Sequence, residues 1–398
     1  MEIGDLQFLI ADGDEFQRRW LSIMLTNLGV RTIYEAGDGS SALAVLRNPQ
    51  NRIDITFIDL NLSGMDCMAL IHQVAEHKFE TSVILISALD TSVMFSVAAM
   101  ARACGIELLG TIEKPVAPEP LQALFKQYRS PQERNQARKA DLVLTETDLQ
   151  NAIERSEFEP LFQPKVVLAT GQVRGVEAFA RWRHPRHGWV MPAIFIPALE
   201  RIGRMDDLTW IMLEKSIYAY KRWRELDYKI PISLNISPST LAKPGFSEKT
   251  AEFVASHRVE PSAIIIEVTE SATASNLPAF LENLARLRMH GFNLSIDDFG
   301  TGQASMQQLM RIPFSELKLD RSFVAGASQN KAMEMVLSSS LELCRKLKRQ
   351  SVAVGVETRQ DWDFLLKLGC NFGQGFYISR PMDGAAIPAW MEEWSQFF

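Results

Sequence analysis

The sequence is poor in the residues that form sulfur-rich and nitrogen-rich sites. Its 398 residues include four cysteines, with no Cys-x-x-Cys spacing, and six histidines. Few scattered cysteines are typical of a reducing compartment, so we expect a cytoplasmic protein without a zinc site. Because nitrogen and sulfur ligands are scarce, we expect any metal to be held by carboxylates, which favours Mg²⁺, Mn²⁺ or Ca²⁺.

Long apolar runs and a basic excess are also missing. No stretch approaches the roughly 18 apolar residues that span a bilayer, and residues 1–15 lack a basic region ahead of an apolar one. The chain carries 48 acidic and 42 basic side chains. Proteins that bind phosphate backbones need a basic excess. We therefore expect no membrane, secretory or nucleic-acid role.

Short apolar runs alternate with amphipathic stretches over residues 6–128. Strand-like runs occupy 6–11, 53–58, 82–86 and 107–112, and 16–28 has a helical pattern. This alternation predicts an α/β domain over residues 1–128, with a doubly wound parallel sheet and helices on both faces. Residues 129–141 are polar and lack apolar periodicity, which predicts a linker over 129–146 or a solvated helix that extends the first domain.

A second alternation extends over residues 147–398. It contains eight strand-like runs, at 159–164, 173–180, 232–236, 263–268, 293–296, 316–319, 352–356 and 371–376. Nearly all contain or lead into a polar residue: Gln163, Glu177, Asn235, Glu267, Asp297, Lys318, Glu357 and Gln374. Eight βα repeats predict a TIM-like (β/α)8 barrel, whose polar groups gather at the carboxyl ends of the strands.

In the first domain, Asp12, Asp59, Ser87 and Lys114 follow predicted strands. The carboxyl ends of parallel strands share one edge of a sheet, so these side chains should converge there. Carboxylates that hold a divalent cation, with a hydroxyl and a lysine, can accept a phosphoryl group. The set resembles the receiver domain of two-component response regulators. That resemblance implies Asp59 as phosphoacceptor, Mg²⁺ held by Asp12 and Asp59, and a sensor histidine kinase or phosphotransfer protein as partner. Ser87 would be the switch hydroxyl and Lys114 the phosphate partner.

The acidic pair of the receiver family is altered in this chain. The family has two adjacent acids after the first strand, whereas Asp12 is followed by Gly13, and Asp14 and Glu15 come one position later. We expect a missing or displaced Mg²⁺ ligand and slower phosphorylation.

The second domain offers oxygen ligands at the ends of four predicted strands. They are Glu177, Asn235, Glu267, Asp297 and Asp298. Such a set suits Mg²⁺ or Mn²⁺, while Lys318 and Arg181 can balance phosphate charge. Any one of these acids could instead be a salt-bridged surface residue. The adjacent pair Asp297 and Asp298 argues against that alternative, because two like charges after an apolar strand repel unless a cation offsets them. The pattern predicts metal-assisted binding or cleavage of a phosphodiester.

Motifs around these residues resemble a known family. The segment GVEAFARWRHP, with Phe179 where the signature has Leu, precedes LNISP, IIIEVTE, IDDFGTG, KLDRSF and GQGFYISRP. From about residue 147 the chain resembles an EAL domain, the phosphodiesterase family that linearises cyclic di-GMP to pGpG on two divalent metals. The order of a receiver followed by an EAL domain resembles that of known response regulators. EAL domains commonly pair, so the resemblance also implies a homodimer or higher homo-oligomer.

The resemblance implies a role for each matching residue. The first metal would be bound by Glu177, Asn235, Glu267 and Asp297, and the second by Asp297 and Asp298. Lys318 would contact the attacking water and act with Glu177 in catalysis. The nucleotide would be contacted by Gln163, Arg181, Asp320, Glu357 and Gln374, and Glu270 would anchor the loop after Asp298.

Two positions depart from the EAL pattern. In QSVAVGVET the family has Glu where this chain has Val354, so only Glu357 remains. In the family that Glu is a ligand of the second metal and a proposed base for the attacking water, and valine can be neither. Losing a ligand should raise the barrier by several kcal/mol, and about 1.4 kcal/mol costs tenfold in rate, so we expect fewer than two ions. Gln303 and Ala304 also replace a Tyr-Ser pair in the loop that couples metal, nucleotide and dimer partner.

Three functions remain open on these observations. The first is a receptor or adaptor that binds cyclic di-GMP with weak or lost hydrolysis, under receiver control. The second is an active metal-dependent phosphodiesterase that produces pGpG, in which Glu357 or a water replaces the missing ligand. The third is an adaptor that takes up phosphoryl groups and has no nucleotide role. A diguanylate cyclase is not supported, because the sequence has no GGDEF-like stretch.

Overall fold

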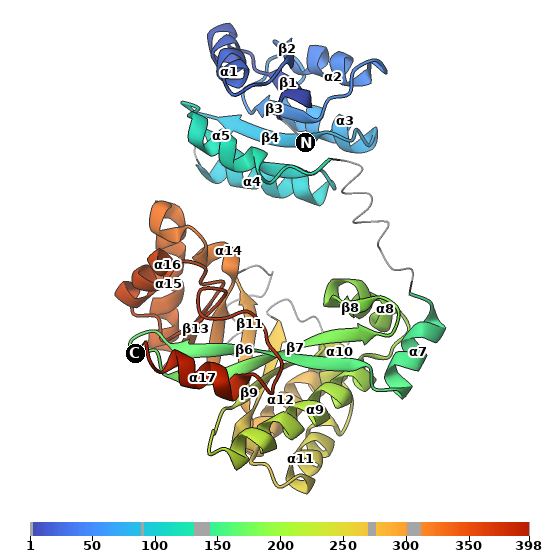
Figure 1. The fold of residues 1–398 in the computed structure, drawn as a ribbon, viewed down its shortest axis with the longest axis vertical. Helices are drawn as coiled ribbons and strands as arrows, with labels where there is room; N and C mark the ends of the chain where they lie inside the picture. The colour runs from blue at the N-terminus through green and yellow to red at the C-terminus, as the bar shows by residue number, and fades with distance from the viewer. Residues whose placement is uncertain (1–2, 89–90, 131–143, 270–275, 301–311, 398) are drawn as a thin grey trace. The chain divides into compact units, whose positions relative to one another are not determined.

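The computed structural model describes residues 3–88, 91–130, 144–269, 276–300 and 312–397. The chain divides into two compact units, Met1–Leu142 and Val143–Phe398 (Figure 1). No helix in the described part of the chain combines the length and the apolar character that a bilayer crossing needs.

The first unit contains a five-stranded sheet with the strand order β2-β1-β3-β4-β5, and every pairing is parallel. Its strands are β1 (Gln7–Ala11), β2 (Thr32–Ala36), β3 (Ile55–Asp59), β4 (Ser82–Ser87) and β5 (Leu108–Glu113). All residues of β3 and β4 are buried, as expected for central strands that are covered on both faces. The edge strand β2 was not predicted, because only Ala36 at its end is buried and it shows no apolar run.

Helices cover both faces of this sheet (Figure 1). They are α1 (Glu15–Asn27), α2 (Gly39–Arg47), α3 (Cys67–Glu76), α4 (Thr91–Ala103) and α5 (Pro118–Phe125), and η1 (Ile3–Asp5) is a short 3₁₀ turn. Leu21 of α1 and Leu121 of α5 pack in one apolar cluster with Phe57, whereas Leu70 of α3 packs in a second cluster with Ile58. The adjacent residues Phe57 and Ile58 point to opposite faces, so the predicted doubly wound architecture is confirmed.

The second unit is a closed ring of eight strands in the order β6-β14-β13-β12-β11-β10-β9-β7, with β7 returning to β6. Their bounds are β6 (Phe158–Val167), β7 (Val173–His184), β9 (Ile232–Asn235), β10 (Ile264–Thr269), β11 (Asn293–Phe299), β12 (Glu316–Leu319), β13 (Gln350–Val354) and β14 (Phe372–Gln374). The short strand β8 (Gly188–Val190) pairs with β7 outside the ring. The predicted TIM-like barrel is confirmed.

Helices surround the ring (Figure 1). They are α7 (Glu146–Glu154), α8 (Pro192–Arg201), α9 (Met205–Glu225), α10 (Pro238–Leu241), α11 (Phe246–Ser256), α12 (Leu277–Met289), α14 (Arg321–Val324), α15 (Lys331–Lys346), α16 (Arg359–Leu368) and α17 (Ile387–Trp394), with 3₁₀ turns η2 (Pro261–Ala263) and η3 (Ala327–Gln329). Helix α7 begins at a capping box in which Thr145 and Asp148 satisfy each other's backbone N–H groups.

The first barrel strand differs from the predicted βα repeat. β6 runs antiparallel to both neighbours, β7 and β14, and it continues past Pro164 to Val167. Its connection to β7 is a hairpin rather than a helix, because only five residues separate the two strands. Gln163 therefore lies within β6, directly opposite Glu177 of β7.

Candidate functional site

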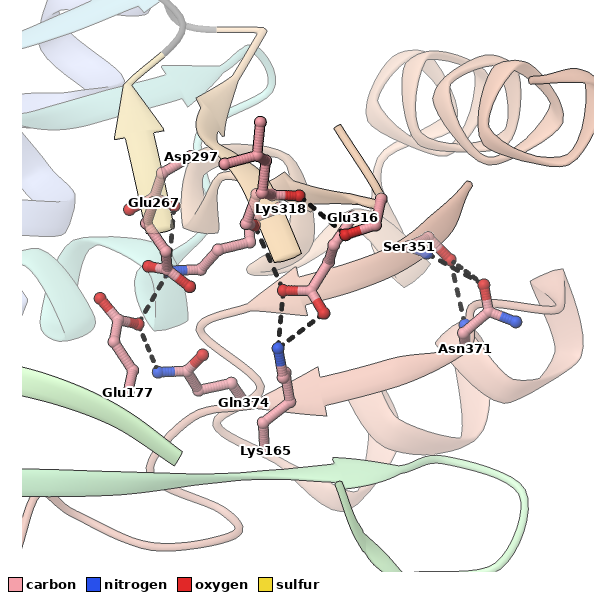
Figure 2. Close-up of polar contacts among 12 residues, drawn as sticks. Lys165, Glu177, Glu267, Asp297, Glu316, Lys318, Ser351, Asn371 and Gln374 are labelled. Atoms are coloured by element: carbon pink, nitrogen blue, oxygen red, sulfur yellow. Dashed lines mark hydrogen bonds and ion pairs between the residues drawn. The ribbon is translucent and has the colours of Figure 1, made fainter. Parts of the chain in front are cut away.

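Three acidic side chains meet inside the barrel. Glu177 of β7, Glu267 of β10 and Asp297 of β11 place carboxylate oxygens within 4.8 Å of one another (Figure 2). Glu177 and Glu267 are 3% and 1% exposed. Glu267 and Asp297 stand near the carboxyl ends of β10 and β11, whereas Glu177 lies within the longer strand β7. This donor set matches the hard oxygen ligands that Mg²⁺, Mn²⁺ and Ca²⁺ prefer.

Lys318 of β12 holds the three acids together. Its Nζ lies 2.8 Å from Glu177 Oε2, 2.7 Å from Glu267 Oε2 and 3.2 Å from Asp297 Oδ1. Burial alone would lower the pKa of Lys318, but the charges of Glu177, Glu267 and Asp297 outweigh it and raise the pKa well above its ordinary value. Lys318 therefore remains an ammonium group.

The pKa values of the three acids shift in different directions. Burial favours the neutral form of Glu177, yet the charge of Lys318 and several hydrogen bonds outweigh it and hold its pKa below the ordinary value. Burial and the charge of Glu177 raise the pKa of Glu267 well above its ordinary value, against the opposing charges of Lys318 and Lys165. Burial also raises the pKa of Asp297. The environment therefore favours the charged form of Glu177 more than that of Glu267 or Asp297.

Two amide side chains donate hydrogen bonds to Glu177, and a third contacts one of them. Asn235 Nδ2 donates to Glu177 Oε1 at 2.7 Å, and Gln374 Nε2 donates to Glu177 Oε2 at 2.8 Å. Gln374 Nε2 also contacts Gln163 Oε1 at 3.1 Å, and Gln163 in turn donates to the carbonyl oxygen of Ser379. One hydrogen-bonded network therefore joins four predicted site residues: Glu177, Asn235, Gln374 and Gln163.

Asp298 lies next to this cluster but outside the three-acid group. It is exposed, its φ is +55°, and its backbone N–H donates to Asp297 Oδ1 at 3.0 Å. Desolvation of its carboxyl group and the charges of Asp297 and Asp320 raise the pKa of Asp298 to about 6. Glu270, Gln303 and Ala304 lie outside the described residues.

The first unit contains a smaller acidic cluster. Lys114 Nζ lies 2.9 Å from Asp12 Oδ2 and 3.0 Å from Asp59 Oδ2. Burial raises the pKa of Asp59, and Lys114 opposes this rise. Ser87 is fully buried at the end of β4, and its carbonyl oxygen accepts a hydrogen bond from the Lys114 N–H at 2.8 Å. The predicted convergence of Asp12, Asp59 and Lys114 at one edge of the sheet is present.

The acids that follow Gly13 have other contacts. The Asp14 side chain caps α1 by accepting from the Gln17 N–H at 3.0 Å, and Glu15 pairs with Arg19 at 3.0 Å. A Cβ atom at Gly13 would lie 3.4 Å from the Asn61 carbonyl oxygen, which is ordinary van der Waals contact. The position therefore has room for a side chain.

Each of the two units, with its acidic cluster, matches a known domain family. The EAL domain model matches residues 146–381, and the response regulator receiver domain model matches residues 8–126. The chain belongs to the EAL domain family. The cyclic di-GMP phosphodiesterase RocR of Pseudomonas aeruginosa is 32% identical over 384 residues, which cover 96% of this chain and 97% of RocR.

Solved EAL structures resemble the second unit. The PaMucR phosphodiesterase in complex with c-di-GMP has 36% sequence identity and a TM-score of 0.57, covering 61% of this chain and 98% of that one. The EAL enzyme Bd1971, in a form with cAMP and cyclic di-GMP bound, has 28% identity and a TM-score of 0.57, covering 69% of this chain and 75% of that one.

Val354 stands beside the acid cluster of this EAL domain. It ends β13 and lies in register with Gln374, the residue whose amide donates to Glu177. The side chain is half-buried and offers no oxygen ligand. The carboxyl end of β13 is therefore apolar at the position that the family pattern assigns to a glutamate.

Three other predicted residues of the EAL domain have partners outside the acid cluster. Arg181 donates to the carbonyl oxygen of its neighbour Ala180 at 2.8 Å. Asp320 caps α14 by accepting from the Ser322 N–H. Glu357 pairs with Arg321 at 2.9 Å, a contact that the sequence reasoning missed although Arg321 lies in the KLDRSF motif. Their predicted contacts with the nucleotide stay predictions.

A second buried charge pair was also missed. Lys165 Nζ lies 2.6 Å from each carboxylate oxygen of Glu316 (Figure 2). A signal for Lys165 existed, because a lysine two residues after Gln163 in an apolar run faces the same side of a strand. Ending the predicted strand at Pro164 concealed it.

Proposed function

We propose that this chain is a response regulator whose EAL barrel binds cyclic di-GMP together with a divalent cation and hydrolyses it weakly or not at all. One observation carries the proposal: the Glu177, Glu267 and Asp297 cluster is assembled on Lys318, while Val354 contributes no ligand beside it. The geometry supports nucleotide binding and argues against an efficient two-metal reaction.

The donor set suits a divalent cation. Glu177, Glu267 and Asp297 supply carboxylate oxygens, and Asn235, hydrogen-bonded to Glu177, adds an amide oxygen that could turn toward the same point. Such an ion, Mg²⁺ or Mn²⁺, would neutralise phosphodiester charge and lower the pKa of bound water. We propose that fewer than two ions bind.

The chain's own residues provide orientation. Lys318 keeps the acids in place and can contact a water between them and the phosphate. Gln374, held by Gln163, donates to the carboxylate of Glu177, and Arg181 can pair with phosphate oxygens. Asp320 and Glu357 can accept hydrogen bonds from guanine N–H groups. Val354 can neither hold a proton nor orient the water.

The receiver domain supplies the proposed control. Asp59 would take a phosphoryl group from a sensor histidine kinase or phosphotransfer protein, with Mg²⁺ on Asp12 and Asp59 and with Lys114 balancing the phosphate charge. Burial of both acids and the direct contact with Lys114 support this assignment. Homo-oligomerisation through the EAL domain remains a prediction.

Substituting Val354→Glu tests the proposal. We expect the wild-type chain to bind cyclic di-GMP in Ca²⁺, and Val354→Glu to raise single-turnover hydrolysis in Mn²⁺ by a hundredfold or more. That gain corresponds to about 2.7 kcal/mol of transition-state stabilisation. Calorimetry measures the binding, and the appearance of linear pGpG measures the hydrolysis.

Val354→Gln is the matched control, because it has the shape of glutamate without the charge or the basic oxygen. It should leave hydrolysis at the wild-type level. Rapid hydrolysis by the wild type, with only a small gain for Val354→Glu, would instead favour an active phosphodiesterase. The similarity to RocR over 96% of the chain keeps that second function under consideration.

A further inference from the structure

Beneath the acid cluster, the barrel holds a second pair of buried charges that the proposed chemistry does not use. Lys165 of β6 and Glu316 of β12 are 2% and 6% exposed. Ser295 Oγ also donates to Glu316 Oε1 at 3.2 Å. A buried ion pair is often no more stabilising than apolar residues of the same volume, so stability alone gives little reason for its presence.

The pair and its hydrogen-bond partner Ser295 lie on strands that also carry residues of the site. Lys165 is two residues from Gln163, Ser295 is two residues before Asp297, and Glu316 is two residues before Lys318. Side chains two apart on a strand point to the same face. The pair therefore forms a lower charged layer, and Figure 2 shows it next to the acids of the upper layer.

The surroundings of Lys165 are adapted to its length. A Cβ atom at Gly175, its partner in β7, would lie 3.0 Å from the Pro231 carbonyl oxygen and 3.8 Å from Lys165 Cε. The absence of a side chain at Gly175 leaves a path for the lysine stem. On another side, the ring of Phe372 lies with its centroid 5.9 Å from Lys165 Nζ. The ammonium is thus enclosed and aimed at Glu316.

Glu316 is a competitor for Lys318. The two Cα atoms are about 7 Å apart along one strand face, within reach of two long side chains. A free Glu316 carboxylate in this low-dielectric interior would attract the nearest ammonium group. Lys165 satisfies Glu316 with two contacts of 2.6 Å, which leaves Lys318 to Glu177, Glu267 and Asp297.

We infer that Lys165 and Glu316 are positioning residues: by satisfying each other they keep Lys318 on the three acids, and so preserve the arrangement that receives the cation and the phosphodiester. This role rests on the proposed function of the barrel as a metal and cyclic di-GMP site. In this role neither residue would contact the cation or the phosphodiester itself.

The experiment titrates Mn²⁺ alone, and then cyclic di-GMP in Ca²⁺, into the full-length chain by calorimetry. Lys165→Met frees Glu316 to draw Lys318 away, and Glu316→Gln frees the Lys165 ammonium to compete with the cation. We expect each to weaken Mn²⁺ binding at least tenfold. The double variant Lys165→Met/Glu316→Leu has neither competitor and should bind within threefold of the wild type.

Lys215→Met is the matched control. It breaks a Lys–Glu pair of 2.8 Å that also involves β6, through Glu159, but that is partly exposed and joins β6 to helix α9. It should leave Mn²⁺ affinity unchanged. If Lys165→Met fails to fold, Glu316→Gln, which preserves side-chain volume, serves as the single variant.

Two results would overturn the inference. In one, the single variants unfold at lower temperature but bind Mn²⁺ with wild-type affinity while folded, which is a purely structural role. In the other, the double variant binds as weakly as the singles. If the wild type binds Mn²⁺ but does not bind cyclic di-GMP, the proposed function is refuted and the Mn²⁺ test of the pair remains valid. If the wild type binds neither, both are refuted.

Discussion

Lys114 in the receiver domain and Lys318 in the EAL domain make the same kind of contact with different numbers of partners. Lys114 lies within 3.0 Å of two carboxylates, whereas Lys318 lies within 3.2 Å of three and is almost fully buried. The amide side chains of Asn235 and Gln374 also donate to Glu177, one of the acids around Lys318. A cation that approaches the receiver cluster therefore meets fewer oxygen ligands than one that approaches the barrel.

The two positions at which this chain lacks an acid of the family pattern, Gly13 and Val354, also differ in their surroundings. Gly13 leaves space at a loop position where a Cβ atom has only ordinary contacts, while Val354 fills the end of a barrel strand with an apolar side chain. At Gly13 no side chain stands in place of the receiver family's acid. At Val354 an apolar side chain stands in place of the EAL family's glutamate. Under the proposed function, the receiver lacks one metal ligand, whereas the barrel lacks a metal ligand together with a proton acceptor.

The largest expected effect comes from removing the anionic centre of the barrel cluster. Glu177→Gln keeps the side-chain shape but removes the carboxylate that Lys318, Asn235 and Gln374 all contact. We expect Mn²⁺ affinity at the barrel to fall about a hundredfold, or about 2.7 kcal/mol. Calorimetry on the full chain measures it.

Glu159→Gln provides the control, because it makes the same change at the exposed ion pair with Lys215. Mg²⁺-dependent phosphorylation of Asp59 should be the same in both variants. A hundredfold loss in the control, or unchanged Mn²⁺ binding in Glu177→Gln, would contradict the assignment of Glu177 as the central ligand.

The polar rim of the barrel was predictable because strand ends are visible in sequence. The 316–319 run matches β12, and Asn235 ends β9 as expected. The contacts among rim residues were not predictable, because they depend on strand stagger. Glu267 is in register with Ser295, so Asp297 lies further along its strand. No sequence period reveals that offset.

The helix-capping role of Asp14 in the receiver domain was also not predicted from the sequence. Asp14 was read as a displaced acid of the metal pair, yet its side chain caps α1. An aspartate directly before a helical pattern was the available signal for a cap. The antiparallel direction of β6 had a similar signal, a short glycine-containing segment between two strand-like runs, which favours a hairpin.

A smaller effect is expected from restoring the receiver acid. Gly13→Asp would place a third carboxyl group near Asp12 and Asp59, in a position with room for its Cβ. We expect the Mg²⁺ concentration for half-maximal phosphorylation of Asp59 by acetyl phosphate to fall about tenfold, or about 1.4 kcal/mol. Phosphorylated and free protein can be separated on a phosphate-binding gel.

The uncharged variant Gly13→Asn distinguishes charge from shape. It should leave the Mg²⁺ dependence near that of the wild type. Equal behaviour of the Asp and Asn variants would mean that the receiver does not lack a ligand, and the contrast with the barrel would then disappear.

The smallest expected effect concerns Asp298 and pH. Because its pKa is raised to about 6 in the folded chain, the native state holds this proton more tightly than the unfolded state, and stability falls as pH rises from about 4 to about 6. Asp298→Asn removes the penalty, and asparagine tolerates the left-handed backbone at φ +55°. Solvent screening limits the gain to about 0.2–1 kcal/mol, or about 1–3 °C in Tm, above pH 7.

Thermal unfolding in chelator at pH 4 and pH 8 measures this difference. Asp227→Asn is the control, since it makes the same change at another exposed left-handed position, φ +63°. Most of the gain for Asp298→Asn should be lost at pH 4, where the folded carboxyl group is protonated and the unfolded one is about half protonated. An equal gain at both pH values would trace the effect to the backbone, whereas a gain confined to high pH shows that Asp298 is held beside other acids, as a cation site requires.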